Sequence, residues 1–128
     1  MKYILYINAL VELLGGLILI MNPTLLLLNS DPEPQGIIVS KLYGILAFAF
    51  GLMSLILAKH FEFTKLFKQV ILTVIGFHFA VGLFMYGVYS QGLTPSIVAS
   101  VLHLSLAIGL GVMYARENQK FETENEPT

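Results

Sequence analysis

The chain has 128 residues, of which 56% are hydrophobic and only 12% are charged. A soluble domain is about 25% charged, so the composition departs from that of a soluble protein. The formal net charge of −1 excludes the basic surface that nucleic-acid-binding proteins carry. The absence of cysteine excludes disulfides, thiol redox chemistry and cysteine metal sites.

Four long apolar segments predict an all-α protein, a four-transmembrane-helix bundle embedded in the lipid bilayer. A membrane-spanning helix needs about 20 mainly apolar residues, and each segment meets this length. The predicted spans cover residues 3–21, 37–58, 66–89 and 94–115. We expect residues 1–116 to form one transmembrane domain and residues 117–128 to form a flexible acidic tail.

The first span begins close to the N-terminus, where a cleavable signal peptide is the rival interpretation. The apolar run is too long for a signal peptide, carries Glu12 at its centre and lacks an A-x-A-like cleavage site. We therefore expect it to remain as a membrane helix. Asn22-Pro23-Thr24 then predicts a break and a short new helical start. Residues 29–36, with two prolines and two acidic residues, form the predicted outer loop.

The second span carries six small residues at spacings of four, three, four, three and four. Helices in lipid associate through close packing of small side chains, because lipid provides no hydrophobic drive between them. The alternation of four and three is a repeat of 3.5 residues, which predicts left-handed helix crossings, either within one chain or between chains of an oligomer. The stripe consists of Ser40, Gly44, Ala47, Gly51, Ser54 and Ala58.

The link at residues 60–68 places three phenylalanines among basic residues, and we expect it to lie along the lipid headgroups. Of the seven basic residues, only Lys41 lies on the side opposite the two termini and this link. The positive-inside rule therefore predicts that both termini are cytoplasmic. The phenylalanines are Phe61, Phe63 and Phe67.

Three ionisable residues, Glu12, His78 and His103, interrupt the apolar spans. A charged side chain at the membrane centre costs on the order of 2.5–3.5 kcal/mol, so such residues mark a site by default. With a helix rise of about 1.5 Å per residue, all three lie about 15–18 Å from the cytoplasmic side, near the middle of the membrane.

Each of the three lies on a helix face with small or polar neighbours, which an inward-facing site requires. We predict a ligand- or proton-binding site formed by these three residues and supported by Asn8, Ser100 and Tyr86. A purely structural role is the alternative. Glu12 would then be a protonated carboxyl bonded to Asn8, and the histidines would be neutral and bonded to Ser100, to Tyr86 or to each other.

Two cofactors suit these residue types, although the sequence gives no reason to expect either. His78 and His103 lie at equal depth and are suitable axial ligands for a haem, but no accompanying sequence signature supports one. A Glu-His-His set also suits zinc or iron, but nothing nearby indicates residues that would orient the ligands.

Proton-coupled transport is a further alternative, because a membrane glutamate can exchange a proton for a cationic substrate. The small multidrug transporters also have four short spans and a glutamate midway along the first, which Glu12 matches. Their aromatic cage around that glutamate is not recognisable here.

Glycine and tyrosine motifs along the whole chain resemble the DoxX-like superfamily of small four-span bacterial membrane proteins. They are Gly15-Gly16 up to Pro23, Lys41-Leu42-Tyr43-Gly44 up to Gly51, and Leu102-His103-Leu104 up to Gly109 and Gly111. The resemblance implies a four-span fold in a bacterial inner (plasma) membrane. It also implies a role like that of members associated with quinone-linked oxidoreductases, but it carries over no catalytic residue.

The sequence as a whole predicts a non-catalytic accessory membrane protein. Such a protein would bind a small ligand, a lipid or a quinone, or would dock with a larger complex or with copies of itself. A proton-coupled transporter using Glu12 is the second possibility, and a haem or metal redox subunit using His78 and His103 is the third.

Overall fold

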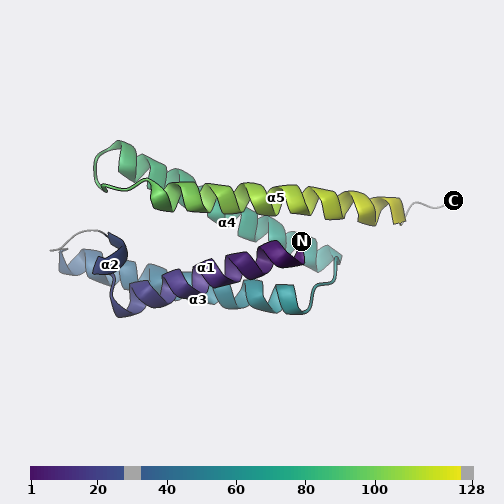
Figure 1. Cartoon of the computed structure of the whole chain (residues 1–128), viewed down its shortest axis with the longest axis horizontal. Coiled ribbons are helices and arrows are strands. Elements are labelled where there is room, and N and C mark those ends of the chain that lie inside the picture. The colour runs from purple at the N-terminus through teal and green to yellow at the C-terminus, as the bar shows by residue number, and fades with distance from the viewer. Residues whose placement is uncertain (28–32, 125–128) are drawn as a thin grey trace.

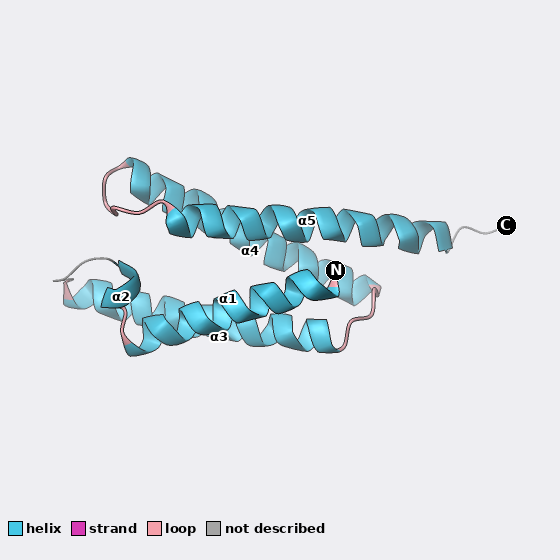
Figure 2. Cartoon of the chain, in the orientation of Figure 1, coloured by secondary structure: helices cyan, strands magenta, loops and turns pink. Residues whose placement is uncertain are grey.

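The computed structural model describes residues 1–27 and 33–124, and within these ranges every regular element is a helix (Figures 1 and 2). Four helices, α1, α3, α4 and α5, are long and apolar enough to cross a membrane. The predicted all-α class with four apolar spans is therefore confirmed. The elements are α1 (Lys2–Met21), α2 (Thr24–Leu27), α3 (Pro34–Lys59), α4 (Lys65–Ser90) and α5 (Val98–Glu124).

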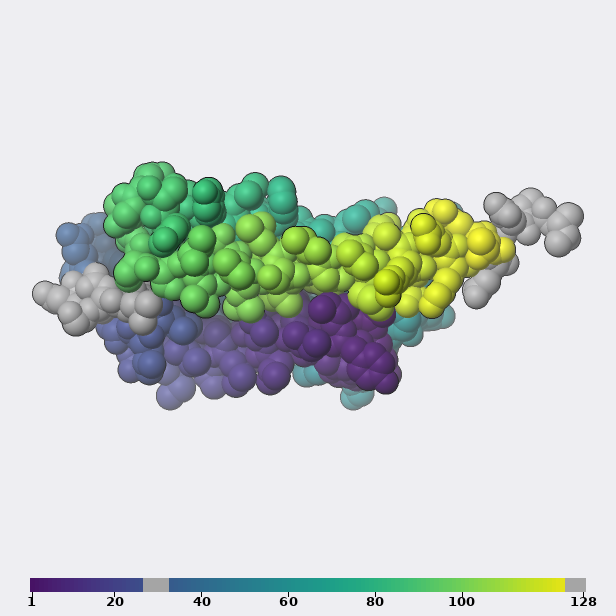
Figure 3. Space-filling model, turned by 45° about the horizontal axis from the view of Figure 1, so that its top comes forward, coloured from purple at the N-terminus to yellow at the C-terminus, as the bar shows by residue number. Residues whose placement is uncertain are grey.

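The long helices form two closely packed pairs, α1 with α3 and α4 with α5. The two pairs lie against each other (Figure 3), and the chain runs up and down through them (Figure 1). The start of α1, the α3–α4 link and the end of α5 lie toward one end of the bundle. The end of α1 and the α4–α5 loop lie at the other (Figure 1). Most of the basic residues are therefore at one end, which is the arrangement that the cytoplasmic orientation assumes.

The small-residue stripe of α3 packs against α1 within the same chain. A Cβ added to Gly16 would lie 2.7 Å from the carbonyl oxygen of Gly44, and one on Gly51 would lie 2.8 Å from the backbone nitrogen of Leu13. Such separations are shorter than real Cβ contacts, so the absence of side chains lets the two backbones approach. Five members of the stripe are buried and Ser40 is half-buried.

The apolar core lies in the half of the bundle that holds the α3–α4 link. Leu5, Ile71, Val74 and Leu110 are fully buried there, so α1, α4 and α5 all contribute to it. Between α3 and α4, the rings of two phenylalanines stack with centroids 4.1 Å apart; they are Phe50 and Phe77. These contacts join the two helix pairs.

The phenylalanines of residues 60–68 pack against one another and against neighbouring helices, while the position of this link along the headgroups stays a prediction. Phe67 is buried, and the rings of Phe61 and Phe63 lie 5.2 and 5.7 Å from its ring. Phe63 also contacts Tyr114 and Phe121 of α5. The rings are thus held by aromatic packing against α4 and α5.

Helix α5 differs from the predicted fourth span at both ends. It begins at Val98, not at residue 94, and the hydroxyl of Ser96 accepts a hydrogen bond from the Val98 N–H. It continues as a helix to Glu124, whereas the sequence predicts a flexible tail from residue 117. Phe121 packs this extension of α5 against the α3–α4 link and the start of α4. Its ring contacts Phe63 and lies 4.0 Å from the Lys68 ammonium. Residues 125–128 of that predicted tail lie outside the described part of the chain.

Candidate functional site

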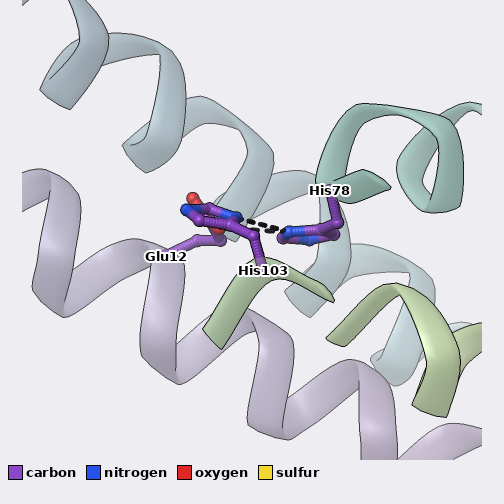
Figure 4. A group of neighbouring side chains, drawn as sticks. All are labelled: Glu12, His78 and His103. Atoms are coloured by element: carbon purple, nitrogen blue, oxygen red, sulfur yellow. Dashed lines mark hydrogen bonds and ion pairs between the residues drawn. The ribbon is translucent and has the colours of Figure 1, made fainter. Parts of the chain in front are cut away.

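Three helices bring Glu12, His78 and His103 together in the middle of the bundle (Figure 4). Glu12 is on α1, His78 on α4 and His103 on α5. The Nδ1 atoms of the two imidazoles are 2.9 Å apart. Glu12 Oε1 lies 3.7 Å from Nδ1 of His78 and 3.8 Å from Nδ1 of His103. The predicted trio is therefore a single cluster.

The cluster is almost completely shielded from the surface. The exposed fraction is 3% for Glu12, 0% for His78 and 7% for His103. Phe77 packs edge-on against both imidazoles, with ring centroids 5.4 and 6.4 Å away. The polar atoms therefore lie in a low-dielectric interior, where an unmade hydrogen bond is costly.

Two polar atoms of the cluster are buried without any hydrogen-bond partner, Glu12 Oε1 and His78 Nε2. Native proteins satisfy the large majority of buried polar atoms, so each exception needs an explanation, and an absent ion or ligand is one. The cluster is thus under-satisfied by its own chain.

Tyr43 of α3 is a member of the site that sequence reasoning missed. Its hydroxyl lies 3.1 Å from Nε2 of His103, so α3 joins the other three long helices at the cluster. In the sequence, Tyr43 stands within the glycine-containing motif that begins the second span. A signal was present, because Tyr43 adds a hydroxyl to the apolar part of this span that follows Lys41.

Within the described part of the chain, the three predicted supporting residues form no hydrogen bond or ion pair with the trio. Asn8 is buried but donates its amide N–H to the Ser54 hydroxyl at 2.8 Å. Ser100 is buried and donates to the carbonyl oxygen of Gly82, also at 2.8 Å. Tyr86 is 53% exposed and points away from the bundle interior. Asn8 and Ser100 therefore join helices, which is a structural role.

The imidazole geometry disfavours haem. An axial pair holds iron and its porphyrin between the two ligating nitrogens. Here the two Nδ1 atoms contact each other directly at 2.9 Å. Beside them, a Cβ on Gly82 would already lie 2.7 Å from the Leu104 side chain, so this glycine provides no space for a ring.

Comparison of the chain with protein-family models, with curated proteins and with solved structures finds no match. The resemblance to the DoxX-like superfamily accordingly stays a prediction, and the geometry of the chain's own residues carries the functional inference.

Proposed function

We propose that this protein is a small integral membrane protein of the bacterial inner membrane that binds a small ligand at the Glu12–His78–His103 cluster without catalysing a reaction. One observation carries the proposal: three ionisable side chains from three helices converge in the membrane interior, and two of their polar atoms lack a partner. A chain keeps such costly groups in the membrane where they serve a purpose.

The contrast with the other buried polar residues supports a binding role. Asn8 with Ser54, and Ser100 with the Gly82 carbonyl, form hydrogen bonds of 2.8 Å across helix interfaces. Each of these two contacts pairs one donor with one acceptor, as expected of structural polar contacts, although Asn8 Oδ1 has no partner among the described residues. In the cluster, the two imidazoles share one hydrogen bond of 2.9 Å between their Nδ1 atoms, and Glu12 Oε1 faces both nitrogens at 3.7 and 3.8 Å without accepting one. Atoms arranged in this way suit a ligand held between them.

The remaining features of the proposal follow the charge pattern and the resemblance. Both termini are cytoplasmic, because six of the seven basic residues belong to that side. A DoxX-like, accessory role is consistent with four short-linked spans. A proton-coupled transporter using Glu12 stays an alternative prediction.

Thermal unfolding in detergent tests the proposal. A binding site is often held at a cost to stability, whereas a structural contact loses stability when one partner is removed. We expect Glu12→Gln, His78→Ala and His103→Ala to melt at or above the wild-type temperature. The control Ser100→Ala removes a satisfied hydrogen bond and should melt below it. If the three site variants melt lower by as much as this control, the cluster is structural and the proposal fails.

A further inference from the structure

We propose that the ligand of this cluster is one divalent first-row transition-metal ion, such as Zn²⁺. Its protein ligands would be Glu12 Oε1, His78 Nδ1 and His103 Nδ1. The inference rests on the proposed function, because it names the ligand of the same site.

The separations of the three atoms are close to those around a single small ion. Ligand atoms about 2.1 Å from a zinc ion lie roughly 3.0–3.4 Å from one another, depending on the coordination geometry. The two imidazole nitrogens, 2.9 Å apart, lie just inside this spacing, and Glu12 Oε1, at 3.7 and 3.8 Å from them, would have to move closer to both. The nearest point that is equidistant from the three atoms lies about 2.0 Å from each, which equals a typical zinc–nitrogen distance.

The chemical types of the three ligand atoms favour one class of metal, the first-row transition metals. Two imidazole nitrogens with one carboxylate oxygen suit zinc, iron and neighbouring transition metals. Ca²⁺ takes six to eight oxygen ligands at about 2.3–2.6 Å, and Mg²⁺ also prefers oxygen, so neither suits two histidines. Three protein ligands leave a fourth position for water or another small ligand, as in zinc sites that are not purely structural.

A bound cation also provides a partner for the unpaired carboxylate oxygen of the cluster, while His78 Nε2 stays unpaired within the described chain. Glu12 Oε1 is buried and accepts no hydrogen bond, although a carboxylate in low dielectric needs a positive partner. The facing Nδ1 atoms, 2.9 Å apart, tolerate each other only with a proton or a cation between them. One metal ion would meet all three atoms at once.

Tyr43 fits this site as a positioning residue. A histidine that binds metal through one nitrogen almost always donates its other N–H to a neighbour, which sets the tautomer and the ring orientation. The Tyr43 hydroxyl lies 3.1 Å from Nε2 of His103 and is placed to accept that N–H. His103 Nδ1 then presents its lone pair to the ion.

Titration of the metal-stripped, full-length protein in detergent with Co²⁺ tests the inference, and Zn²⁺ competition follows. We expect saturable binding of one Co²⁺ per chain, with the visible absorption of cobalt in a nitrogen and oxygen environment. Glu12→Gln, His78→Ala and His103→Ala should abolish it. The matched control is His60→Ala, because His60 is exposed at the end of α3, outside the cluster.

The tyrosines provide a second matched pair. Tyr43→Phe removes the hydroxyl beside His103 and should weaken Co²⁺ binding by about 10- to 100-fold, the usual cost of losing such a neighbour. Tyr86→Phe removes a hydroxyl from an exposed ring and should leave the affinity unchanged. Wild-type protein loaded with Zn²⁺ supplies a measurement that needs no variant, since X-ray absorption spectroscopy should report two imidazole ligands.

The outcomes separate the metal from the proposed function. If neither Co²⁺ nor Zn²⁺ binds, while the site variants keep wild-type thermal stability, the inference that the ligand is a metal fails. The proposal that the cluster binds a small ligand is then kept. Binding that survives in the site variants, or disappears in His60→Ala, overturns the metal inference as well. If no metal binds and the site variants also melt low, both proposals fall.

Discussion

Two adjacent glycines of α1 predict opposite responses to the same added methyl group. Gly16 lies against α3, where a Cβ would meet the Gly44 carbonyl oxygen and the Phe48 backbone nitrogen, each at 2.7 Å. Gly15, its neighbour in sequence, would place a Cβ in open space, with nothing within 4 Å. Gly16→Ala should therefore disrupt the α1–α3 contact, and Gly15→Ala should not.

The magnitude follows from what the methyl group meets. Both atoms facing Gly16 belong to the backbone, so the two helices have to separate, and overpacking of this kind costs about 1–3 kcal/mol. Replacing a helical glycine by alanine gains roughly 0.5–1 kcal/mol at either position, because the unfolded chain loses freedom. The gain cancels between the two variants, so Gly16→Ala should be less stable than Gly15→Ala by about 1–3 kcal/mol.

Reversible unfolding in mixed detergent micelles, followed by circular dichroism, measures this difference. Gly15→Ala should be as stable as wild type or slightly more so, and Gly16→Ala should fall below both. Equal free energies of unfolding for the two variants would refute the close approach of α1 and α3 at this point. A loss confined to Gly15→Ala would reverse the assigned faces of α1.

Two further predictions concern contacts that the structure adds to the bundle. Ser54→Ala leaves the buried amide of Asn8 without its acceptor and should cost about 1–3 kcal/mol of unfolding free energy. In a double-mutant cycle with Asn8→Ala, additive losses would contradict this hydrogen bond. Phe121→Ala should release the α5 extension from the α3–α4 link, which limited trypsin digestion would detect as faster cleavage beyond residue 115. Phe84→Ala, at an exposed ring on α4, is the control and should leave the cleavage rate unchanged.

The sequence predicted the cluster because depth is a one-dimensional quantity. Helix rise and the bounds of the spans set how far Glu12, His78 and His103 lie from the membrane surface. Which residues these three side chains contact depends on the rotation and the order of the helices. Depth in the membrane specifies neither. The sequence therefore paired Asn8 with Glu12, but the structure turns Asn8 toward Ser54 on α3.

Composition and periodicity by themselves determined that this chain is a membrane protein with four apolar helices. They also determined that a small-residue stripe runs along one of them, because hydrophobic length and a 3.5-residue period are local properties. Only the tertiary structure decided that α1 covers this stripe, that Tyr43 reaches His103, and that α5 continues past residue 116. Each of these depends on contacts between residues far apart in the chain, and the local sequence pattern does not specify such contacts.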